Sequence, residues 1–326
     1  MRAGEWWDYK LVPIFAAFYA TAAVLQIPVS SLWLAALTVL LSIVPGAAYV
    51  SVINDVTDRA DDAMAGKPNR VAGLTRPAVV ALVSIPIVAG LFFAFLWRDD
   101  VLLLSLYLAA WAAFSLYSLP PFRLKTRGIF GVLADACGAH LFPTLVAVVV
   151  VLRAAERPVR ISWLVIAGAW AFAYGLRGIL FHQLSDREND HNAAVRTFAA
   201  RHPPHVAARL GAFIAFPLEL AAAAAMVWQI RSLWPVGFLA LYALLGAVRI
   251  YRWHWNAVII TPKPRFFVVL QEYYDFFLPI AILIASALQH PADVLALAVH
   301  LLVFPRRLGH WLIEIRERLR ARFRKR

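Results

Sequence analysis

The stretch INDVTDRADDAMAGKPNR, Ile53 to Arg70, follows directly on an apolar run that begins near residue 31. It carries aspartates at positions 55, 58, 61 and 62, four acids within eight residues. Like charges at such spacings destabilise a helix, so a cluster of this kind needs a cation nearby. The stretch therefore raises two questions: what kind of chain surrounds it, and which cation its carboxylates bind.

The chain around it is too apolar for an ordinary soluble domain. Its 326 residues are 62% hydrophobic, with a mean hydropathy of +0.69. Apolar runs close to the roughly 20 residues that cross a bilayer recur throughout. We predict spans near 9–27, 31–53, 77–96, 101–118, 129–152, 161–184, 205–229, 233–250 and 267–288, with a shorter tenth segment over 291–304. The predicted fold is an all-α integral membrane protein, a bundle of nine or ten transmembrane helices in one domain over 1–304.

The charge distribution indicates membrane orientation and argues against nucleic acid as a partner. The formal net charge of +13 comes mostly from short loops and from the tail, 305–326. With the N-terminus in the cytoplasm, the inner loops hold 17 Lys and Arg and the outer loops 5. We therefore predict a cytoplasmic N-terminus and a cytoplasmic basic tail that contacts anionic lipid, as an interfacial helix or as a solvated extension. The Ala- and Arg-rich composition favours a bacterial inner membrane.

A second acidic stretch, HQLSDREND over His182–Asp190, lies at the end of the predicted span 161–184. Both stretches follow a helix that runs inward, so both face the cytoplasm. The equivalence indicates two related halves, although the two stretches share little identity beyond their acids. Solvated loop charges paired with neighbouring Arg and Lys would explain one stretch. Two on one side of a membrane favour a metal–diphosphate site.

The spacing of the acids supports such a site. If the first stretch stays helical, Asp55, Asp58 and Asp62 share one face within roughly 60° of arc, and the fourth acid points elsewhere. Asp186 and Asp190, at i and i+4, also share a face. Hard oxygen ligands that leave room for substrate phosphates suit Mg²⁺. No His/Cys cluster has zinc spacing, and the single Cys137 allows neither a disulfide nor a Cys-based metal site.

These motifs resemble those of the UbiA superfamily of intramembrane prenyltransferases. The family's N-D-x-x-D-x-x-x-D motif reads Asn54 to Asp62 here, and its D-x-x-x-D motif reads Asp186 to Asp190. GKPNRVAGLTRP, residues 66–77, is similar to the family's basic run, although RV stands where RP is usual. YSLPPFRLKTRGIFG, residues 117–131, is similar to the loop between helices 4 and 5. The resemblance covers about 10–290 and leaves the tail unmatched.

The resemblance implies a Mg²⁺-dependent prenyltransferase that moves a polyprenyl group from its diphosphate to a lipophilic acceptor, by default an aromatic one. It implies two Mg²⁺ ions, held by Asn54, Asp55, Asp58, Asp62, Asp186 and Asp190. The basic candidates for the diphosphate are Lys67, Arg70, Arg123, Lys125 and Arg187. Each of these basic residues is equally well explained as an orientation signal. Arg123 and Lys125 are favoured because they flank the PPF turn in the matching loop.

Several polar residues inside predicted spans have two interpretations. Arg177 lies within a span, where a charge costs about 2.5–3.5 kcal/mol on insertion scales, so we assign it to diphosphate binding. His182 lies four residues before Asp186 and is a candidate to deprotonate the acceptor, or else a hydrogen-bonded core histidine. His140 has the same two interpretations. Acids in QEYYDF, residues 271–276, either bind the acceptor or favour the start of a helix.

Aromatic residues near the expected cytoplasmic mouth, Tyr117 and Tyr174, are candidates to line the path of the isoprenoid and to stabilise a carbocation. Three rival functions remain. A UbiA-type terpene cyclase would ionise the same kind of diphosphate, and the motifs do not separate cyclisation from transfer. An ion-coupled transporter would place its acids nearer the membrane midplane. A CDP-alcohol phosphotransferase would need a D-G-x-x-A-R run, which the sequence lacks.

Overall fold

A computed structural model of the protein describes residues 3–64, 66, 68–192, 195–309, 311, 314 and 316. The long helices in this part of the chain are α1 (Ala3–Leu25), α2 (Trp33–Thr57), α4 (Arg76–Leu96), α5 (Val101–Ser118), α7 (Phe142–Ala154), α8 (Ile161–Ser185), α12 (Phe216–Ile230), α13 (Trp234–Trp253), α14 (Leu278–Gln289) and α15 (Asp293–Val303). The shorter helices are α3 (Arg59–Met64), α6 (Ile129–Ala136), α9 (Arg187–Asn192), α10 (Phe198–Arg201) and α11 (Pro204–Leu210). The expected all-α fold is confirmed.

Eight helical segments in the described ranges are long and apolar enough to cross a membrane. Two further apolar helices, Tyr273–Gln289 and Asp293–Val303, are shorter. The predicted count of nine or ten spans is therefore not confirmed. Each predicted segment is largely helical, but the one predicted over 267–288 begins in a short strand and a turn. The outward side chains of α4 are almost all large and apolar, as expected for a helix that faces lipid.

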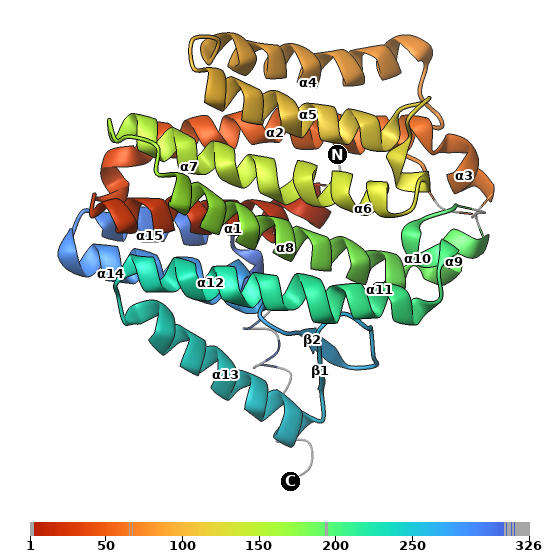
Figure 1. Cartoon of the computed structure of the whole chain (residues 1–326). Helices are drawn as coiled ribbons and strands as arrows, with labels where there is room; N and C mark the ends of the chain where they lie inside the picture. Colours follow the sequence, from red (N-terminus) through yellow and green to blue (C-terminus); the bar gives the residue numbers. More distant parts are fainter. Residues whose placement is uncertain are drawn as a thin grey trace.

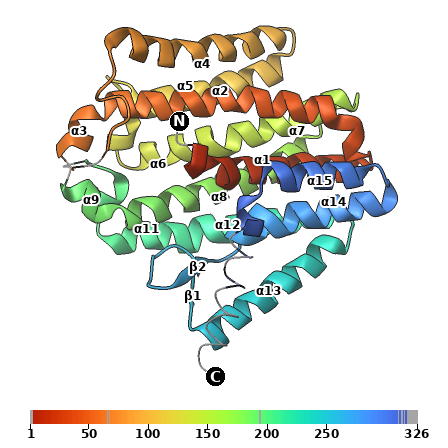
Figure 2. The ribbon, with the colours of Figure 1, turned by 180° about the vertical axis from the view of Figure 1, so that it is seen from behind.

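The helices lie side by side with α1 near the centre (Figures 1 and 2). Between Leu11 and Ala22 the side chains of α1 are almost fully buried, and α1 packs against α7, α12 and α14. In contrast, α4 and α13 lie at opposite edges of the bundle (Figure 1). A helix that is apolar all round can occupy either position, which explains why hydropathy alone does not rank the helices by depth.

Three helices contain a π-helical turn, each continuous with an α-helical part. These turns are η3 (Cys137–Leu141) between α6 and α7, η4 (Gly211–Ala215) between α11 and α12, and η5 (Tyr273–Phe277) before α14. Two 3₁₀ turns, η1 (Val29–Leu32) and η2 (Leu124–Thr126), lie in connections. Such π turns insert a residue into a helix and are frequent at functional sites.

The connection after α13 is the one described region with strands. β1 (Asn256–Val258) pairs in parallel with β2 (Phe266–Val268), with Ala257 opposite Phe267. This small ribbon lies below α11 and α12 in Figure 1. The residue that follows β1 contacts the interior of the bundle: the carbonyl oxygen of Ile259 accepts a hydrogen bond from Arg177 at 3.2 Å.

The start of the tail packs onto the bundle. The Arg307 guanidinium donates to Asp275 at 2.5 Å and stacks over the ring of Tyr9, with its carbon 4.7 Å from the ring centroid. Trp311 packs against Phe277 with the ring centroids 5.0 Å apart. The described start of the tail thus contacts protein, and the predicted contact of the tail with anionic lipid stays a prediction. The other residues of 305–326 lie outside the described residues.

Candidate active site

Two segments at one end of the bundle share the same local backbone (Figures 1 and 2). We call residues 54–71 the first acidic segment and residues 182–199 the second acidic segment. In the first, α2 ends and Asp58 adopts φ −101° and ψ 5° before α3 begins. In the second, α8 ends and Asp186 adopts φ −93° and ψ 4° before α9 begins. Each helix is therefore kinked at an aspartate, and the expectation of one straight helix through the first segment is corrected.

The last aspartate of each segment has the same kind of anchor seven residues later. The Asn69 side-chain amide donates to Asp62 at 2.8 Å, and the Thr197 hydroxyl donates to Asp190 at 2.8 Å. Each anchor closes a short loop that follows the six-residue helix. The loop therefore fixes the carboxylate that would otherwise be free to swing into solvent.

The arginine after the kink also has equivalent contacts in the two segments. Arg59 donates to the backbone carbonyl of Val71, and Arg187 donates to that of Ala199 at 2.9 Å, in both cases twelve residues later. These arginines close the loops from the inside. Arg187 was predicted to bind the diphosphate, and the structure shows it bonded to a backbone oxygen of its own segment.

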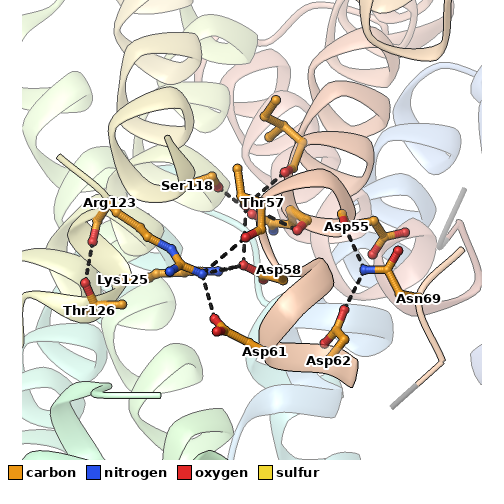
Figure 3. Close-up of polar contacts among 12 residues, drawn as sticks. Asp55, Thr57, Asp58, Asp61, Asp62, Asn69, Ser118, Arg123, Lys125 and Thr126 are labelled. Carbon is orange, nitrogen blue, oxygen red and sulfur yellow. Dashed lines mark hydrogen bonds and ion pairs between the residues drawn. The ribbon is translucent and has the colours of Figure 1, made fainter. Parts of the chain in front are cut away.

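Cations from the α5–α6 connection bind the first acidic segment (Figure 3). Arg123 donates to Asp58 at 3.1 Å and to Asp61 at 2.6 Å, and the Lys125 ammonium also binds Asp58. Burial acts to lower the pKa of Arg123, but its two carboxylate partners outweigh this and raise it. Burial lowers the pKa of Lys125, against the opposing effect of Asp58. Asp61, expected to point elsewhere, shares a cation with Asp58.

The two other polar groups at the start of the first segment are held from within the bundle. Asn54 accepts a hydrogen bond from the Ser118 hydroxyl on α5. Asp55 is buried, with 4% of its surface exposed, and its backbone carbonyl accepts a hydrogen bond from Asn69 at 2.7 Å. Asp55 is thus deeper than Asp58 and Asp62, which are both half-buried.

The second acidic segment is more open. The basic side chain paired with Asp186 among the described contacts is His182, with Nε2 3.8 Å from the carboxylate. The side chain of His182 is 69% exposed and that of Asp186 is 38% exposed. A contact of that length is too long for a hydrogen bond. The carboxylate of Asp186 is therefore partly exposed to solvent.

A polar cavity of about 460 Å³ extends inward from the acidic segments. Its lining comes from the ends of α1, α2, α5 and α8 and from η3. The polar members of the lining are Tyr9, Lys10, Ser51, Asn54, Tyr117, Asp135, His140, Tyr174, Arg177, His182 and Gln271. Both residues that were singled out as aromatic candidates, Tyr117 and Tyr174, are in this lining.

The carboxylates of the two segments act on the same tyrosine. Asp135, Asp58 and Asp190 all interact electrostatically with Tyr117 at the end of α5. Asp58 belongs to the first acidic segment and Asp190 to the second, so acids that lie 132 positions apart in the sequence act on one ring.

An apolar cavity of about 110 Å³ adjoins the polar one. The two share Lys10, Val50, Ser51 and Phe114 in their linings. Beyond these residues the lining is aliphatic and aromatic, from α1, α2, α5, η3 and α7. The arrangement offers a polar mouth for charged groups and an apolar interior for a hydrocarbon.

Arg177 is committed to a buried ion pair. Its Nε and one terminal nitrogen donate to Glu219 on α12 at 2.6 and 2.8 Å, and its other terminal nitrogen donates to Ile259. Both side chains are at most 3% exposed. Three of the five guanidinium N–H donors are thus used within the protein, which favours a structural role for Arg177, and its assignment to diphosphate binding stays a prediction.

The sequence model of the UbiA prenyltransferase family matches residues 11–270, most of the described bundle. The chain belongs to this family. Its fold is similar to that of a UbiA homolog from Archaeoglobus fulgidus, a structure bound to GPP and Mg2+, at 17% sequence identity and a TM-score of 0.51. The alignment covers 89% of this chain and 99% of that one, and at this identity the likeness shows the fold alone. No curated protein matches the chain.

The other predicted site residues occupy varied positions. Arg70 lies in the exposed turn after α3, and Lys67 lies outside the described residues. Arg123 and Lys125, the favoured basic pair, are the ones that contact the first acidic segment. The two acids of the QEYYDF stretch form ion pairs: Glu272 pairs with Arg249, and Asp275 pairs with Arg307.

The donor set of the two segments suits a hard cation. The candidates are carboxylate and amide oxygens, which Mg²⁺ prefers, and Mg²⁺ sites usually combine a few carboxylates with substrate phosphates. Among the described residues, no group of three or more His, Cys, Asp and Glu is gathered closely enough to hold a metal ion by itself. In this UbiA member the protein oxygens would therefore supply only part of a coordination shell.

Sequence reasoning missed several residues at this site. Asn69 and Thr197 anchor aspartates, yet each stands in an unremarkable loop, and only their equal offset from an aspartate distinguishes them. Asp135 lines the cavity from within the predicted span 129–152. The signal that drew attention to Arg177, a charge inside an apolar run, applies equally to Asp135. Glu219 could have been found in the same way, as the partner that a buried arginine requires.

Proposed function

We propose that this protein catalyses Mg²⁺-dependent transfer of a polyprenyl group from its diphosphate to a lipophilic acceptor within the membrane. One observation carries the proposal: two equivalent acidic segments flank the mouth of a polar cavity that continues into an apolar one. A prenyl diphosphate has the same division, with a highly charged head and a hydrocarbon chain. Membership of the UbiA family supports the same reaction class.

The acids of the two segments would hold Mg²⁺ together with the diphosphate: Asp55, Asp58 and Asp62 from the first, Asp186 and Asp190 from the second, with Asn54 assisting. The predicted number of two ions accords with two segments. When bound, Mg²⁺ neutralises the charge that builds on the leaving diphosphate as the allylic carbon–oxygen bond breaks. Asp55, which is buried and deepest of the five, would act by orienting its neighbours.

Arg123 and Lys125 would contribute to binding the diphosphate by changing partners. In the structure both bind Asp58, so the first acidic segment is compensated by cations of the protein itself. Arg suits bidentate recognition of phosphate and Lys provides a point charge. A bound metal at Asp58 would repel both cations and direct them toward the diphosphate. Arg70 and Lys67 remain candidates for the same role.

The orientation in the membrane follows from the site. We propose that the mouth, the N-terminus and the start of the tail face the cytoplasm, where prenyl diphosphates are soluble, in a bacterial inner membrane. The donor's chain length and the acceptor's identity are left open by the lining of the cavities. The basic residues near the membrane surface would also contact anionic lipid.

The test is diphosphate release by the purified protein in detergent. Geranyl, farnesyl and geranylgeranyl diphosphate would be offered with and without Mg²⁺, with and without a panel of phenolic acceptors. Removal of Mg²⁺ should abolish release. Asp58→Asn and Asp186→Asn should each lower it by about 1,000-fold, because a metal ligand contributes several kcal/mol of charge stabilisation.

Asp100→Asn is the matched control. Asp100 begins α5 at the opposite end of the bundle, where it pairs with Arg153, and it should leave release unchanged. Equal losses in all three variants would sink the proposed site. Hydrocarbon analysis then separates the alternatives: a cyclic product without any acceptor identifies a terpene cyclase. Absence of both release and donor-induced thermal stabilisation would favour an ion-coupled transporter.

A further inference from the structure

The polar side chains that line the cavity fall into two groups. In the first group each has a partner in the protein: Asn54 has Ser118, Tyr174 has Asp275 and Arg177 has Glu219. A second group, which includes Lys10, Asp135, His140 and Gln271, has no side-chain hydrogen bond or ion pair with another described residue. Of these four, His140 is buried and the others are half-buried. Polar side chains that line a cavity without a protein partner are available to a polar ligand, so the second group indicates where one would bind.

A π turn brings two members of the second group to one wall. Asp135 and His140 are five residues apart, which in a regular α-helix places them about 140° apart around the axis. The π turn η3, Cys137–Leu141, inserts one residue between them and reduces the separation to that of an i, i+4 pair, about 40°. Both side chains consequently line the cavity.

The wall opposite is shaped to receive the histidine. A Cβ atom at Gly175 on α8 would lie 2.9 to 3.1 Å from the His140 ring and its Cβ, so any larger residue there would displace the imidazole. The ring of Tyr174 meets the imidazole edge-on, with centroids 5.1 Å apart. His140 is thus held at the cavity wall by packing, and its ring nitrogens remain available to a ligand.

The group lies where the donor's reacting carbon should be. A prenyl diphosphate bound with its head at the acidic segments and its chain in the apolar cavity would place its first carbon at the junction of the two. Lys10 lines both cavities and interacts electrostatically with His140. Asp135 interacts with Tyr117, as do Asp58 and Asp190 of the acidic segments. The unpaired side chains of Lys10, on α1, and Asp135, on α6, therefore lie beside the junction of the two cavities.

We propose that Asp135, with His140 and Lys10 beside it, forms the acceptor subsite, that the acceptor carries a hydroxyl group, and that Asp135 takes the proton of that hydroxyl. The proposal rests on the proposed function. In the reaction the donor's allylic carbon–oxygen bond breaks and diphosphate leaves with its electron pair. The acceptor's hydroxyl oxygen then forms the new bond to the allylic carbon, and its O–H bond breaks as the proton passes to the Asp135 carboxylate.

The chemistry of the three side chains selects a hydroxyl. A carboxylate accepts a hydrogen bond from an O–H group and so increases the electron density on its oxygen. The Lys10 ammonium stabilises the negative charge that develops there. An acceptor without a hydrogen-bond donor would leave the Asp135 carboxylate without a partner in the cavity, and sites built to hydrogen-bond a substrate hydroxyl discriminate against such analogues. His182, by contrast, lies at the exposed mouth beside Asp186.

The first test compares two probes that differ only in this group, 4-heptylphenol and 4-heptylanisole, with the full-length protein in nanodiscs. Wild type should bind the phenol about tenfold more tightly than the methyl ether, as expected for a charge-assisted hydrogen bond. Asp135→Leu should bind both equally. His182→Leu, the matched control, should keep the preference. Equal binding of the probes by wild type, or loss of the preference only in His182→Leu, would overturn the proposal.

The second test separates this proposal from the proposed function. Donor carrying ¹⁸O in the bridging position reports ionisation, because the label scrambles when the bond breaks and re-forms. Asp135→Leu should change the exchange by less than about threefold and lower transfer to a phenol by about 100-fold, within the range for general-base catalysis. Equal loss of exchange and transfer would overturn the role of Asp135. If wild type neither exchanges the label nor binds the donor with Mg²⁺, the proposed function itself fails.

Discussion

The two acidic segments have nearly the same backbone and opposite electrostatic surroundings. Each has a helix that ends at an aspartate, a six-residue helix, an anchor to the last aspartate and an arginine that closes the loop. The first segment is contacted by the cations Arg123 and Lys125, whereas the described basic side chain nearest to Asp186 is His182, at 3.8 Å. The counterparts of Asp55, Asp58, Asp61 and Asp62 are Gln183, Asp186, Asn189 and Asp190.

This difference shows how a repeated scaffold accommodates unequal charge. Where the first segment has four aspartates, the second has two, with amides in the remaining positions. Four carboxylates so close together would repel, and the α5–α6 connection supplies the compensating cations. The equivalent connection in the second half carries the strands β1 and β2, and between them Ile259 and Ile260 lie against Arg177 and Gly211. We therefore expect the carboxylate charges of the first segment to be compensated without a bound metal, and those of the second segment to be compensated only when metal is bound.

We expect the largest loss of stability when Arg177, the buried arginine of the second half, is replaced. Arg177→Met leaves Glu219 charged and unpaired at 0% exposure, and breaking such a pair typically costs about 3–5 kcal/mol. Thermal unfolding in detergent should show a large loss of stability. If Arg177 instead served the diphosphate, the variant would keep its stability and lose donor binding.

The double variant Arg177→Met/Glu219→Leu provides the control for that measurement. Replacement of both charges by apolar groups of similar volume is often neutral, so the double variant should regain most of the lost stability. Regained stability together with Mg²⁺-dependent donor binding would assign the pair to structure. Continued instability of the double variant would contradict this assignment.

The sequence was sufficient for the fold and for the acids, because both are written in local patterns. Apolar runs of membrane length predict helices without any knowledge of their packing. Acids at i, i+3, i+4 and i+7 predict a shared face, and Asp58 and Asp190, one from each acidic segment, both interact electrostatically with Tyr117. The pattern does not predict depth, because Asp55 is buried whereas Asp58 and Asp62 are half-buried.

What the sequence could not provide depends on contacts between distant segments. Arg177 and Arg123 are both basic residues beside predicted spans, and only the packing of α8 against α12 reveals that Arg177 faces Glu219. The polar wall of the cavity depends on a π turn, and an inserted helical residue leaves no mark in the hydropathy pattern. The length of α14, which falls short of a full span, likewise follows from the turn at η5.

A smaller change in stability, measured without metal, tests whether the two acidic segments differ in how their charges are compensated. Asp58→Asn removes the partner of the buried Lys125, so with EDTA present it should destabilise the protein by about 1–2 kcal/mol. Asp186→Asn removes a partly exposed charge beside Asp190 and should change stability by less than about 0.5 kcal/mol. Thermal unfolding of both variants in EDTA decides the matter. Equal destabilisation would contradict the inference that only the first segment is compensated by the protein.

The smallest effect tests whether the two segments are equivalent in construction. Asn69→Ala and Thr197→Ala each remove one side-chain hydrogen bond to the last aspartate of a segment, and each should cost about 1 kcal/mol. Both should also weaken donor binding in Mg²⁺ by similar factors, because in each case the freed carboxylate loses its orientation. Thr197→Ser is the matched control, since it keeps the hydroxyl and should bind the donor as wild type does. A loss in one segment alone would mean that the shared backbone conceals an unequal division of the diphosphate between the two halves.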